Sequence, residues 1–217
     1  TNNNKDILIT GDSFSEDIVN AVFEADLDET YEFSSYYIPV KCGVLFVENK
    51  SDREHPRMQC EKTSFYDNNL QKLILSADEV WIASAWKKAD LDYMELSLKN
   101  IIQLNNNLTI FGSKSFGSVS QEWYEQHEVE LWSSSILEET DINHFRDLFH
   151  LNNSIRDMTN YQGINFINTQ ELICDDYYYC QNYLNGDLIS HDGGHLTPFG
   201  AKILGMKLNQ LLKKTML

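Results

Sequence analysis

The sequence is poor in basic residues. Its 217 residues include 17 Lys and Arg against 33 Asp and Glu, which gives a formal net charge of −16 at pH 7. Nucleic-acid binding needs Lys and Arg side chains clustered opposite the phosphates, and the sequence contains no such cluster. We therefore expect no nucleic-acid partner.

Long apolar runs are also missing. No run approaches the ~18 apolar residues that a membrane-spanning helix needs, and no basic segment followed by an apolar one stands at the start. The hydrophobic content is nevertheless 42%, and 11 Phe, 11 Tyr and 4 Trp are spread along the chain, which argues against disorder. This composition predicts one domain over residues 1–217 with a hydrophobic core. Because the chain begins with Thr1 rather than Met, we expect a processed protein or a piece of a longer one.

Cysteine is scarce, with four residues in all. Cys42 with Cys60, and Cys174 with Cys180, lie close enough in the sequence for two local disulfides. Pairs with the C-x2-C spacing of zinc sites are absent, and we expect no metal. The alternative is four buried, reduced thiols in a cytosolic protein. Disulfides would instead place the chain in the periplasm or outside the cell.

The alternation of apolar runs and amphipathic stretches predicts an α/β fold. Runs rich in β-branched, aromatic and aliphatic residues indicate five strands, at 7–9, within 31–40, and at 80–83, 108–111 and 164–167. Apolar residues at helical spacing indicate helices that begin near residues 15, 70, 91, 142 and 198. We therefore predict a three-layer, doubly wound sandwich around a five-stranded parallel sheet. Such sheets carry their sites at the carboxyl ends of the strands.

A serine and a histidine–aspartate pair stand where this fold would place a site. Ser13 follows the first predicted strand in a Gly-Asp-Ser tripeptide, next to the free N–H groups of a helix N-terminus. Asp192 and His195 precede the last predicted helix, so that the carboxylate can orient an imidazole that removes the serine proton. Three alternatives stay open: the tripeptide is only a turn and cap, Asp192 only closes an Asx-turn, or His191 joins the pair in binding a metal.

Together, these motifs resemble the SGNH (GDSL) hydrolase family from end to end. The resemblance implies its flavodoxin-like fold, with Ser13 as nucleophile, His195 as base and Asp192 as the partner of the histidine. More narrowly, the chain resembles the SGNH domain fused behind the membrane-embedded acyltransferase-3 domain of bacterial polysaccharide O-acetylases. That narrower match rests on Lys41-Cys42-Gly43, Cys60, the run Val-Trp-Ile-Ala-Ser-Ala-Trp at 80–86, the pair Cys174 and Cys180, and the run His-Leu-Thr-Pro-Phe-Gly-Ala at 195–201.

The oxyanion hole of the family is matched only in part. The resemblance implies the backbone N–H groups of Ser13 and Gly43 as donors, although Gly43 is equally typical of an ordinary turn. The family's third donor, an asparagine, has no counterpart after the strand at 80–83. Trp86 stands there instead, and it can replace the donor, belong to the core or stack on a sugar. A missing donor of this kind commonly costs ~10² to 10³ in rate, so we expect slow ester hydrolysis unless another group substitutes.

The resemblance implies an acyl-serine enzyme without a cofactor, which passes an acetyl group from a donor to a glycan acceptor on a cell-surface polysaccharide or lipopolysaccharide. It also implies a C-terminal domain in the periplasm or on the extracellular face, tethered to the inner membrane by an upstream acyltransferase-3 domain. We expect Asp12, Trp86 and Ser115 to contact substrate, although Ser115 also fits a solvated loop. Two alternatives remain: a free-standing secreted carbohydrate acetylesterase, and a catalytically idle glycan-binding SGNH module.

Overall fold

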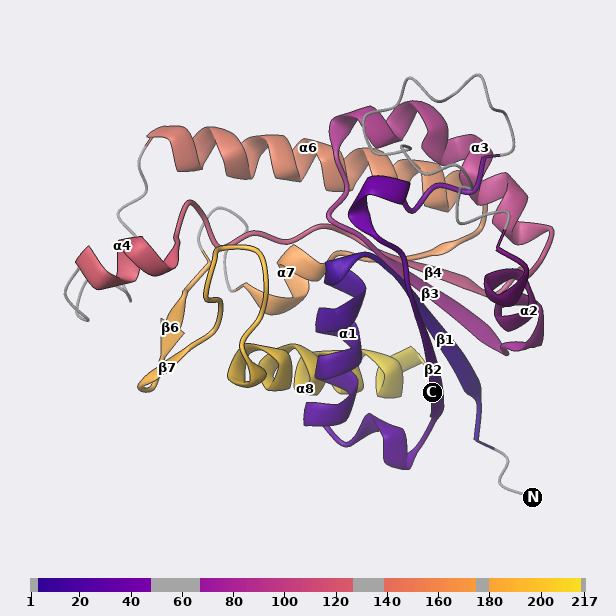
Figure 1. Cartoon of the computed structure of the whole chain (residues 1–217), viewed down its shortest axis with the longest axis horizontal. Helices are drawn as coiled ribbons and strands as arrows, with labels where there is room; N and C mark the ends of the chain where they lie inside the picture. Colours follow the sequence, from indigo (N-terminus) through magenta and orange to yellow (C-terminus); the bar gives the residue numbers. More distant parts are fainter. Residues whose placement is uncertain (1–3, 48–66, 127–138, 175–179, 216–217) are drawn as a thin grey trace.

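Five parallel strands form the central sheet of the computed structural model, which describes residues 4–47, 67–126, 139–174 and 180–215 (Figure 1). The strands are β1 (Asp6–Gly11), β2 (Glu32–Tyr37), β3 (Glu79–Ala83), β4 (Leu108–Phe111) and β5 (Asn165–Ile167). Their order in the sheet is β2-β1-β3-β4-β5, and every neighbouring pair is parallel. The predicted five-stranded parallel sheet is confirmed, and each predicted strand overlaps an observed one.

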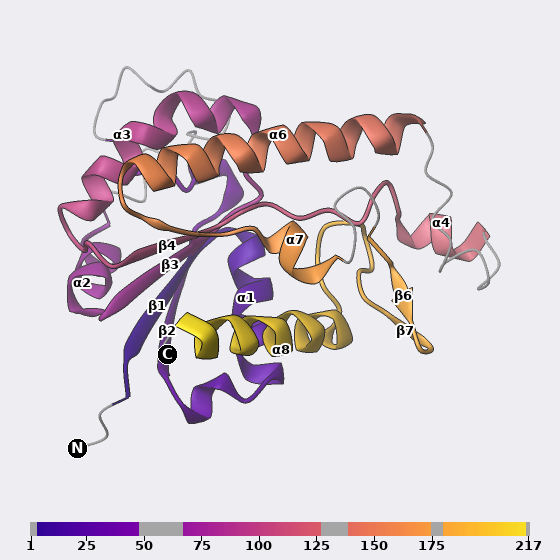
Figure 2. The ribbon, with the colours of Figure 1, turned by 180° about the vertical axis from the view of Figure 1, so that it is seen from behind.

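Helices cover both faces of the sheet, as predicted (Figures 1 and 2). The principal helices are α1 (Ser13–Glu24), α2 (Asn68–Ser76), α3 (Leu91–Ile102), α6 (Glu139–Tyr161) and α8 (Pro198–Thr215). Shorter elements that the sequence did not predict are α4 (Gln121–Gln126), α7 (Thr169–Ile173) and a hairpin of β6 (Tyr183–Leu184) and β7 (Asp187–Leu188). Within the described ranges, no helix combines the length and apolarity that a membrane span requires.

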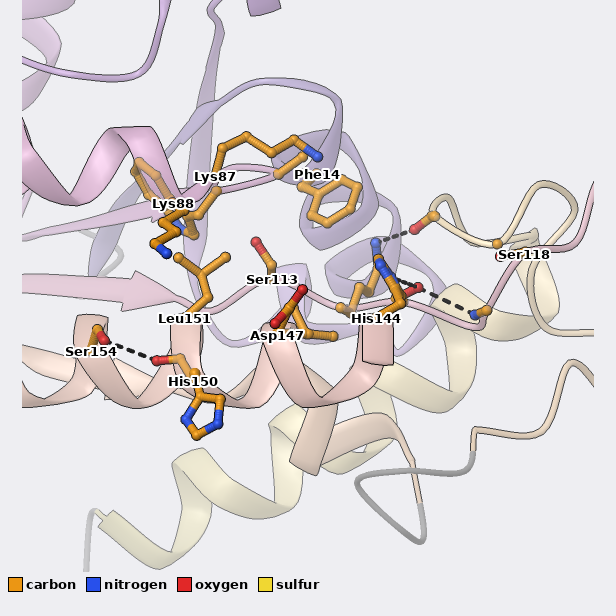
Figure 3. A pocket seen from close by; sticks show the side chains of 18 of the residues that line it. Phe14, Lys87, Lys88, Ser113, Ser118, His144, Asp147, His150, Leu151 and Ser154 are labelled. Atoms are coloured by element: carbon orange, nitrogen blue, oxygen red, sulfur yellow. Dashed lines mark hydrogen bonds between the residues drawn. The ribbon is translucent and has the colours of Figure 1, made fainter. Parts of the chain in front are cut away.

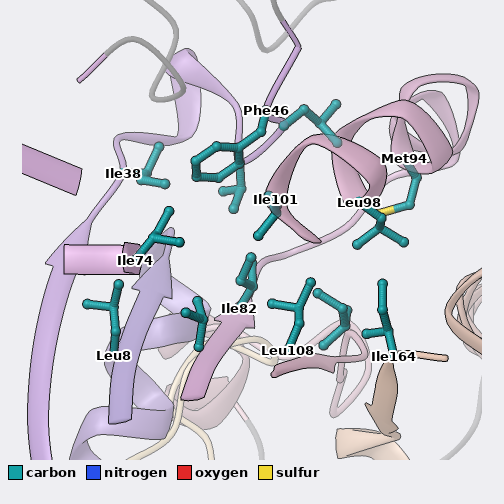
Figure 4. Close-up of a cluster of buried hydrophobic side chains, with 14 of the residues drawn as sticks. Leu8, Ile38, Phe46, Ile74, Ile82, Met94, Leu98, Ile101, Leu108 and Ile164 are labelled. Carbon is teal, nitrogen blue, oxygen red and sulfur yellow. The ribbon is translucent and has the colours of Figure 1, made fainter. Parts of the chain in front are cut away.

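Alternating side chains of each strand feed two separate cores. Leu8 of β1 points into the cluster that α2, α3 and α6 cover, together with Ile82 and Leu108 of the neighbouring strands (Figure 4). Ile7 and Ile9 point to the other face, where α1 and α8 pack. Because successive residues of a strand face opposite sides, a strand that is covered on both faces reads as a continuous apolar run. This is why the strands could be predicted from the sequence.

The sheet has its topological switch point at β1. The chain leaves β1 for β2 on one side and reaches β3 on the other side, so the loops after β1 and β3 separate at the carboxyl edge. Gly11 ends β1 at a φ of 147°, and a Cβ atom there would lie 1.7 Å from the Ala83 carbonyl oxygen. Only glycine therefore allows the two strands to approach each other at this edge.

The chain segments near the carboxyl edge are tied down locally. The N-terminal half of α6 continues beyond this edge of the sheet (Figures 1 and 2). Thr197 caps α8, because its hydroxyl accepts the Gly200 N–H at 3.1 Å. The predicted disulfide between Cys174 and Cys180 is present. Cys60 lies outside the described residues, so its pairing with Cys42 stays a prediction.

Candidate active site

Ser13, His195 and Asp192 meet at the carboxyl edge of the sheet, although 182 residues separate the serine from the histidine. Ser13 Oγ lies 2.8 Å from His195 Nε2, and His195 Nδ1 lies 2.6 Å from Asp192 Oδ2. A neutral imidazole that donates its Nδ1–H to the carboxylate presents an acceptor to the serine hydroxyl. The arrangement can therefore remove the serine proton during attack on a carbonyl carbon.

Asp192 also organises the backbone of its own loop. Its Oδ1 accepts the N–H groups of Gly194 at 2.9 Å and of His195 at 2.7 Å. Desolvation by itself raises the pKa of Asp192, but the hydrogen bonds from His195 and Gly194 outweigh it and lower the pKa to about 2. Asp192 is thus an anion throughout the neutral range and keeps the imidazole oriented.

The loop requires a glycine at position 193. Gly193 has a φ of 80°, and a Cβ atom there would lie 2.2 Å from the Gly117 carbonyl oxygen. Its own carbonyl oxygen accepts the Phe116 N–H at 2.8 Å. The loop that carries His195 is therefore pressed directly against the segment that follows β4, with no room for a side chain between them.

Asp12 does not reach the substrate side of the site, in contrast to our expectation. The residue is fully buried, and its carboxylate accepts the Ser84 hydroxyl at 2.6 Å and the Ala85 N–H at 3.1 Å. The same carboxylate accepts the Phe14 N–H at 3.1 Å and so caps α1. Because charged acceptors bind tightly, Asp12 fastens the loop after β3 to the helix that carries Ser13.

The expected oxyanion donor Gly43 is engaged elsewhere. Its N–H donates to the Val40 carbonyl oxygen at 3.2 Å and closes a short 3-10 turn (Val40–Cys42). Trp86, the possible substitute for the missing asparagine, donates its indole N–H to the Phe111 carbonyl oxygen at 2.8 Å. Trp86 is buried, packs in the core and also lines the pocket, and its engaged N–H makes it a core residue rather than an oxyanion donor. The Ser13 N–H stands at the first turn of α1, where the helix dipole favours a developing negative charge.

A pocket of about 820 Å³ adjoins the triad. Figure 3 shows His144 and Asp147 rising from α6 on one side, with Phe14, Lys87 and Lys88 on the other. It is lined by Phe14, Ala85, Trp86, Lys87, Lys88, Leu91, Ser113, Lys114, Ser115, Gly117, Ser118, His144, Asp147, Leu148, His150, Leu151, Ser154, Asp192, Gly193 and Gly194. Its volume lies in the range typical of small-ligand sites and exceeds what an acetyl group needs.

Ser115 lines this pocket and is buried, so it is not a solvated loop residue, and its contact with substrate stays a prediction. Its backbone N–H and carbonyl are both held by the side-chain amide of Gln170, at 2.7 and 3.0 Å. Its hydroxyl lies 2.8 Å from His144 Nε2. His144 was not predicted as a site residue, because no pattern in the sequence relates a residue of this helix to a loop 29 positions earlier.

A buried ion pair between Lys114 and Asp17, behind the triad, was also not predicted from the sequence. Lys114 follows β4, its side chain is 1% exposed, and its Nζ lies 2.6 Å from Asp17 Oδ2. Burial lowers the pKa of Lys114, and the Asp17 carboxylate opposes this effect. One signal was present in the sequence: Asp17 stands four residues after Ser13 and therefore shares its face of α1.

His191, Asp192 and His195 offer ligand atoms within 4.8 Å of one another. Asp192 and His195 are bonded to each other, however, and the second imidazole nitrogen of His195 contacts Ser13. A cation at these residues would have to replace the contacts that link the serine to the carboxylate. The geometry favours the proton relay over a metal site.

Comparisons with known proteins found one family model and a set of solved structures. The family model described as an SGNH domain (fused to AT3 domains) matches residues 1–210. The comparison with curated proteins found no match.

Solved structures share the fold at low sequence identity. The periplasmic domain of a lipopolysaccharide acetyltransferase from Salmonella ser. Paratyphi A aligns with a TM-score of 0.69 at 18% identity, covering 98% of this chain and 85% of that one. A carbohydrate acetylesterase from Sinorhizobium meliloti aligns with a TM-score of 0.55 at 11% identity, covering 97% and 99%. An acetylxylan esterase from Geobacillus stearothermophilus aligns with a TM-score of 0.52 at 13% identity, covering 97% and 95%.

Proposed function

Because the chain belongs to the family of SGNH domains fused to AT3 domains, we propose that it is an acyl-serine O-acetyltransferase or acetylesterase domain that acts on a cell-surface glycan. The observation that carries this proposal is the continuous relay from Ser13 Oγ through the His195 imidazole to the Asp192 carboxylate, with links of 2.8 and 2.6 Å. The geometry is that of a nucleophile, a base and an orienting group.

The reaction proceeds through two transfers. Ser13 Oγ attacks the carbonyl carbon of an acetyl ester while His195 Nε2 takes the hydroxyl proton, and the leaving alcohol then receives that proton. Asp192 stabilises the imidazolium that exists between these steps. In the second half, His195 removes a proton from water or from a sugar hydroxyl, whose oxygen attacks the acetyl carbon, and the imidazolium returns the proton to Ser13 Oγ as the serine leaves. The Ser13 N–H contributes to the binding of the oxyanion in both halves.

The pocket supports a glycan as the acceptor. It runs from the triad loop to α6, and hydroxyl, imidazole and carboxylate groups stand along it at Ser113, His144, Asp147 and Ser154. Such groups exchange hydrogen bonds with sugar hydroxyls. The His195 side chain is 38% exposed and Asp192 is 40% exposed, so a bound acceptor has to displace water if transfer is to outrun hydrolysis.

The proposal also includes the cellular compartment of the domain and its attachment to the membrane. The disulfide between Cys174 and Cys180 supports an oxidising location, and the similar domain from Salmonella ser. Paratyphi A is periplasmic. We place this domain in the periplasm, behind an acyltransferase-3 domain of the same chain that tethers it to the inner membrane. The complete reading frame tests this directly: a chain without membrane spans upstream would favour the free-standing acetylesterase.

A glycan-binding module without catalysis is the second candidate. It is favoured by the engaged N–H groups of Gly43 and Trp86, which leave the oxyanion hole poorer than the family pattern implies. The retained proton relay argues against it, because binding alone does not require a serine in contact with an imidazole.

Labelling by a fluorophosphonate probe separates the two candidates. The wild type should be labelled at Ser13, and Ser13→Ala should abolish labelling, because the probe reacts only with an activated serine. Ser76→Ala, at the exposed end of α2, is the matched control and should be labelled like the wild type. If no serine-dependent labelling of the wild type occurs, the binding module becomes the better description.

A further inference from the structure

Lys114 is an unusual lysine because all its donors are used inside the protein. Its Nζ lies 2.6 Å from Asp17 Oδ2, 2.6 Å from the Gly194 carbonyl oxygen and 3.7 Å from the centre of the Phe14 ring. An ammonium group has three N–H donors, and these three contacts accept them. Nothing is left for substrate, so Lys114 is not a substrate-binding cation even though it borders the pocket.

Asp17 and Lys114 together bind the backbone on both sides of His195. Its Oδ2 accepts Lys114, and its Oδ1 accepts the Leu196 N–H at 3.1 Å. The residue before His195 is therefore held through its carbonyl by Lys114, and the residue after it through its N–H by Asp17. Both charged side chains are nearly excluded from water, at 1% and 5% exposure.

The pair joins the three segments on which the Ser13–His195 contact depends. Asp17 lies one helical turn beyond Ser13 on α1, Lys114 follows β4, and both hold the loop of His195. Phe14 adds a fourth link, because its ring lies over Lys114 and packs edge-on against the His195 ring at 5.8 Å between centroids. The other hydrogen bonds of His195 itself come from its own loop, from Asp192 and Ser190, and these do not fix that loop relative to α1.

We infer that the buried Lys114–Asp17 ion pair positions His195 against Ser13, and that it does so by fixing the backbone on both sides of the histidine. The inference rests on the proposed function for its catalytic consequence, whereas its structural part is independent of activity. Lys114 and Asp17 act through His195 and touch no reacting atom, so they are positioning residues.

A purely structural role is the competing explanation. A buried ion pair is often no more stabilising than two well-packed apolar side chains, since desolvation offsets the attraction between the charges. If stability were the only role, an apolar pair would serve equally well. Positioning, by contrast, needs donors and acceptors at the two loop positions, which apolar side chains do not offer.

The test uses two variants, the single substitution Lys114→Met and the double substitution Asp17→Leu plus Lys114→Met. Both are compared with a control substitution in another ion pair of the protein. The control is Lys5→Met, which breaks the Lys5–Glu79 ion pair of 2.7 Å at the opposite edge of the same sheet. Three quantities are measured on folded protein: the rate of fluorophosphonate labelling of Ser13, the downfield proton resonance of the His195 imidazole, and the hydrogen exchange of the Leu196 amide.

We expect labelling of both Lys114 variants to slow by about tenfold to about a hundredfold, as small displacements of catalytic groups do. The imidazole resonance should shift or broaden and the Leu196 amide should exchange faster, whereas Lys5→Met should stay within about twofold of the wild type. The double variant keeps the test valid if the single variant does not fold, because it leaves no unpaired buried charge.

Variants that lose thermal stability but keep the wild-type labelling rate, imidazole resonance and Leu196 exchange would overturn the inference. A double variant that also fails to fold assigns the pair to folding and overturns it as well. If the wild type itself is not labelled, the proposed function fails instead, and the resonance and exchange measurements still decide whether the pair holds the loop.

Discussion

At the scale of single residues, three carboxylates organise this site, of which Asp12 and Asp17 are buried and Asp192 is exposed. Asp12, Asp17 and Asp192 each accept several hydrogen bonds, and each connects Ser13 or His195 to a neighbouring segment. The chain has 33 acidic residues, and the sequence does not distinguish these three from the solvated ones. The hydrogen-bond partners that the tertiary structure brings to each carboxylate decide which of them act as anchors.

We predict that Asp12→Asn lowers the free energy of unfolding by about 1.5 to 3 kcal/mol, the range for buried hydrogen bonds to a charged group. An amide offers only one oxygen where the carboxylate serves Ser84, Ala85 and Phe14. Urea unfolding measures the change, with the exposed Asp28→Asn as the control. Equal stability of the two variants would contradict the role of Asp12 as an anchor.

The pKa of Asp192 predicts a pH dependence of stability. It is lowered from 3.8 to about 2, and a carboxyl with a depressed pKa stabilises the fold fully above its unfolded value. The contribution of Asp192 should therefore be complete above about pH 4 and disappear as the pH falls toward about 2.

The measurement is the difference in free energy of unfolding between the wild type and Asp192→Asn from pH 2 to 7. The difference should be constant in the neutral range and shrink below about pH 4. A difference that grows on acidification would show that the carboxyl is not held as an anion. Protonation of Asp192 also cannot cause a loss of activity near neutral pH, so any such loss has to come from another group.

At the scale of elements, α6 contributes one wall of the pocket. His144, Asp147, Leu151 and Ser154 follow one another at helical spacing and line the same cavity. This helix was predicted from its apolar face, which packs on the sheet. Its function-bearing face is polar, and a polar helix face in a sequence is typical of a solvated surface.

We predict that His144→Ala lowers acetyl transfer to a glycan acceptor more than it lowers hydrolysis of p-nitrophenyl acetate. The imidazole stands on the acceptor side of the pocket and has no contact with Ser13 among the described residues, so its loss should raise KM for the acceptor and leave attack by water nearly unchanged. The ratio of acetylated glycan to free acetate measures the effect. Asp157→Ala, at an exposed position of α6 outside the lining of the pocket, is the comparison that distinguishes a specific contact from a general change of the helix.

At the scale of the whole molecule, the formal charge of −16 shapes the encounter with substrate. Long-range repulsion slows the approach of anionic esters at low salt, and added salt screens it, since the Debye length falls from about 30 Å at 0.01 M to about 8 Å at 0.15 M. We predict that kcat/KM for an anionic acetyl ester rises severalfold over this range, whereas that for neutral p-nitrophenyl acetate stays level. A parallel response of both esters would contradict an electrostatic cause.

How much the sequence determined can be judged from particular residues. Leu8, Ile82 and Ile110 mark strands because both faces of the sheet are covered, and the spacing of Met94, Leu98 and Ile101 marks a helix; both are local consequences of burial. Ser13, Asp192 and His195 were identified as candidates because short motifs and strand ends coincide. The hydrogen bond that engages the Gly43 N–H was not predicted, three roles stayed open for Trp86, and the contacts of Lys114 and His144 were not predicted.

The difference between the features that could be predicted and the contacts that could not has a physical cause. Apolar periodicity and motifs lie in neighbouring residues, and they were therefore enough to predict the sheet, its covering helices and the edge where the candidate site lies. Hydrogen-bond donors and charged groups bind partners that lie far away in the sequence, as Lys114 binds Asp17 and Gly194. These pairings depend on the tertiary structure and could not be predicted from local sequence patterns. The tertiary structure therefore determines which polar groups can take part in the reaction and which ones hold them in position.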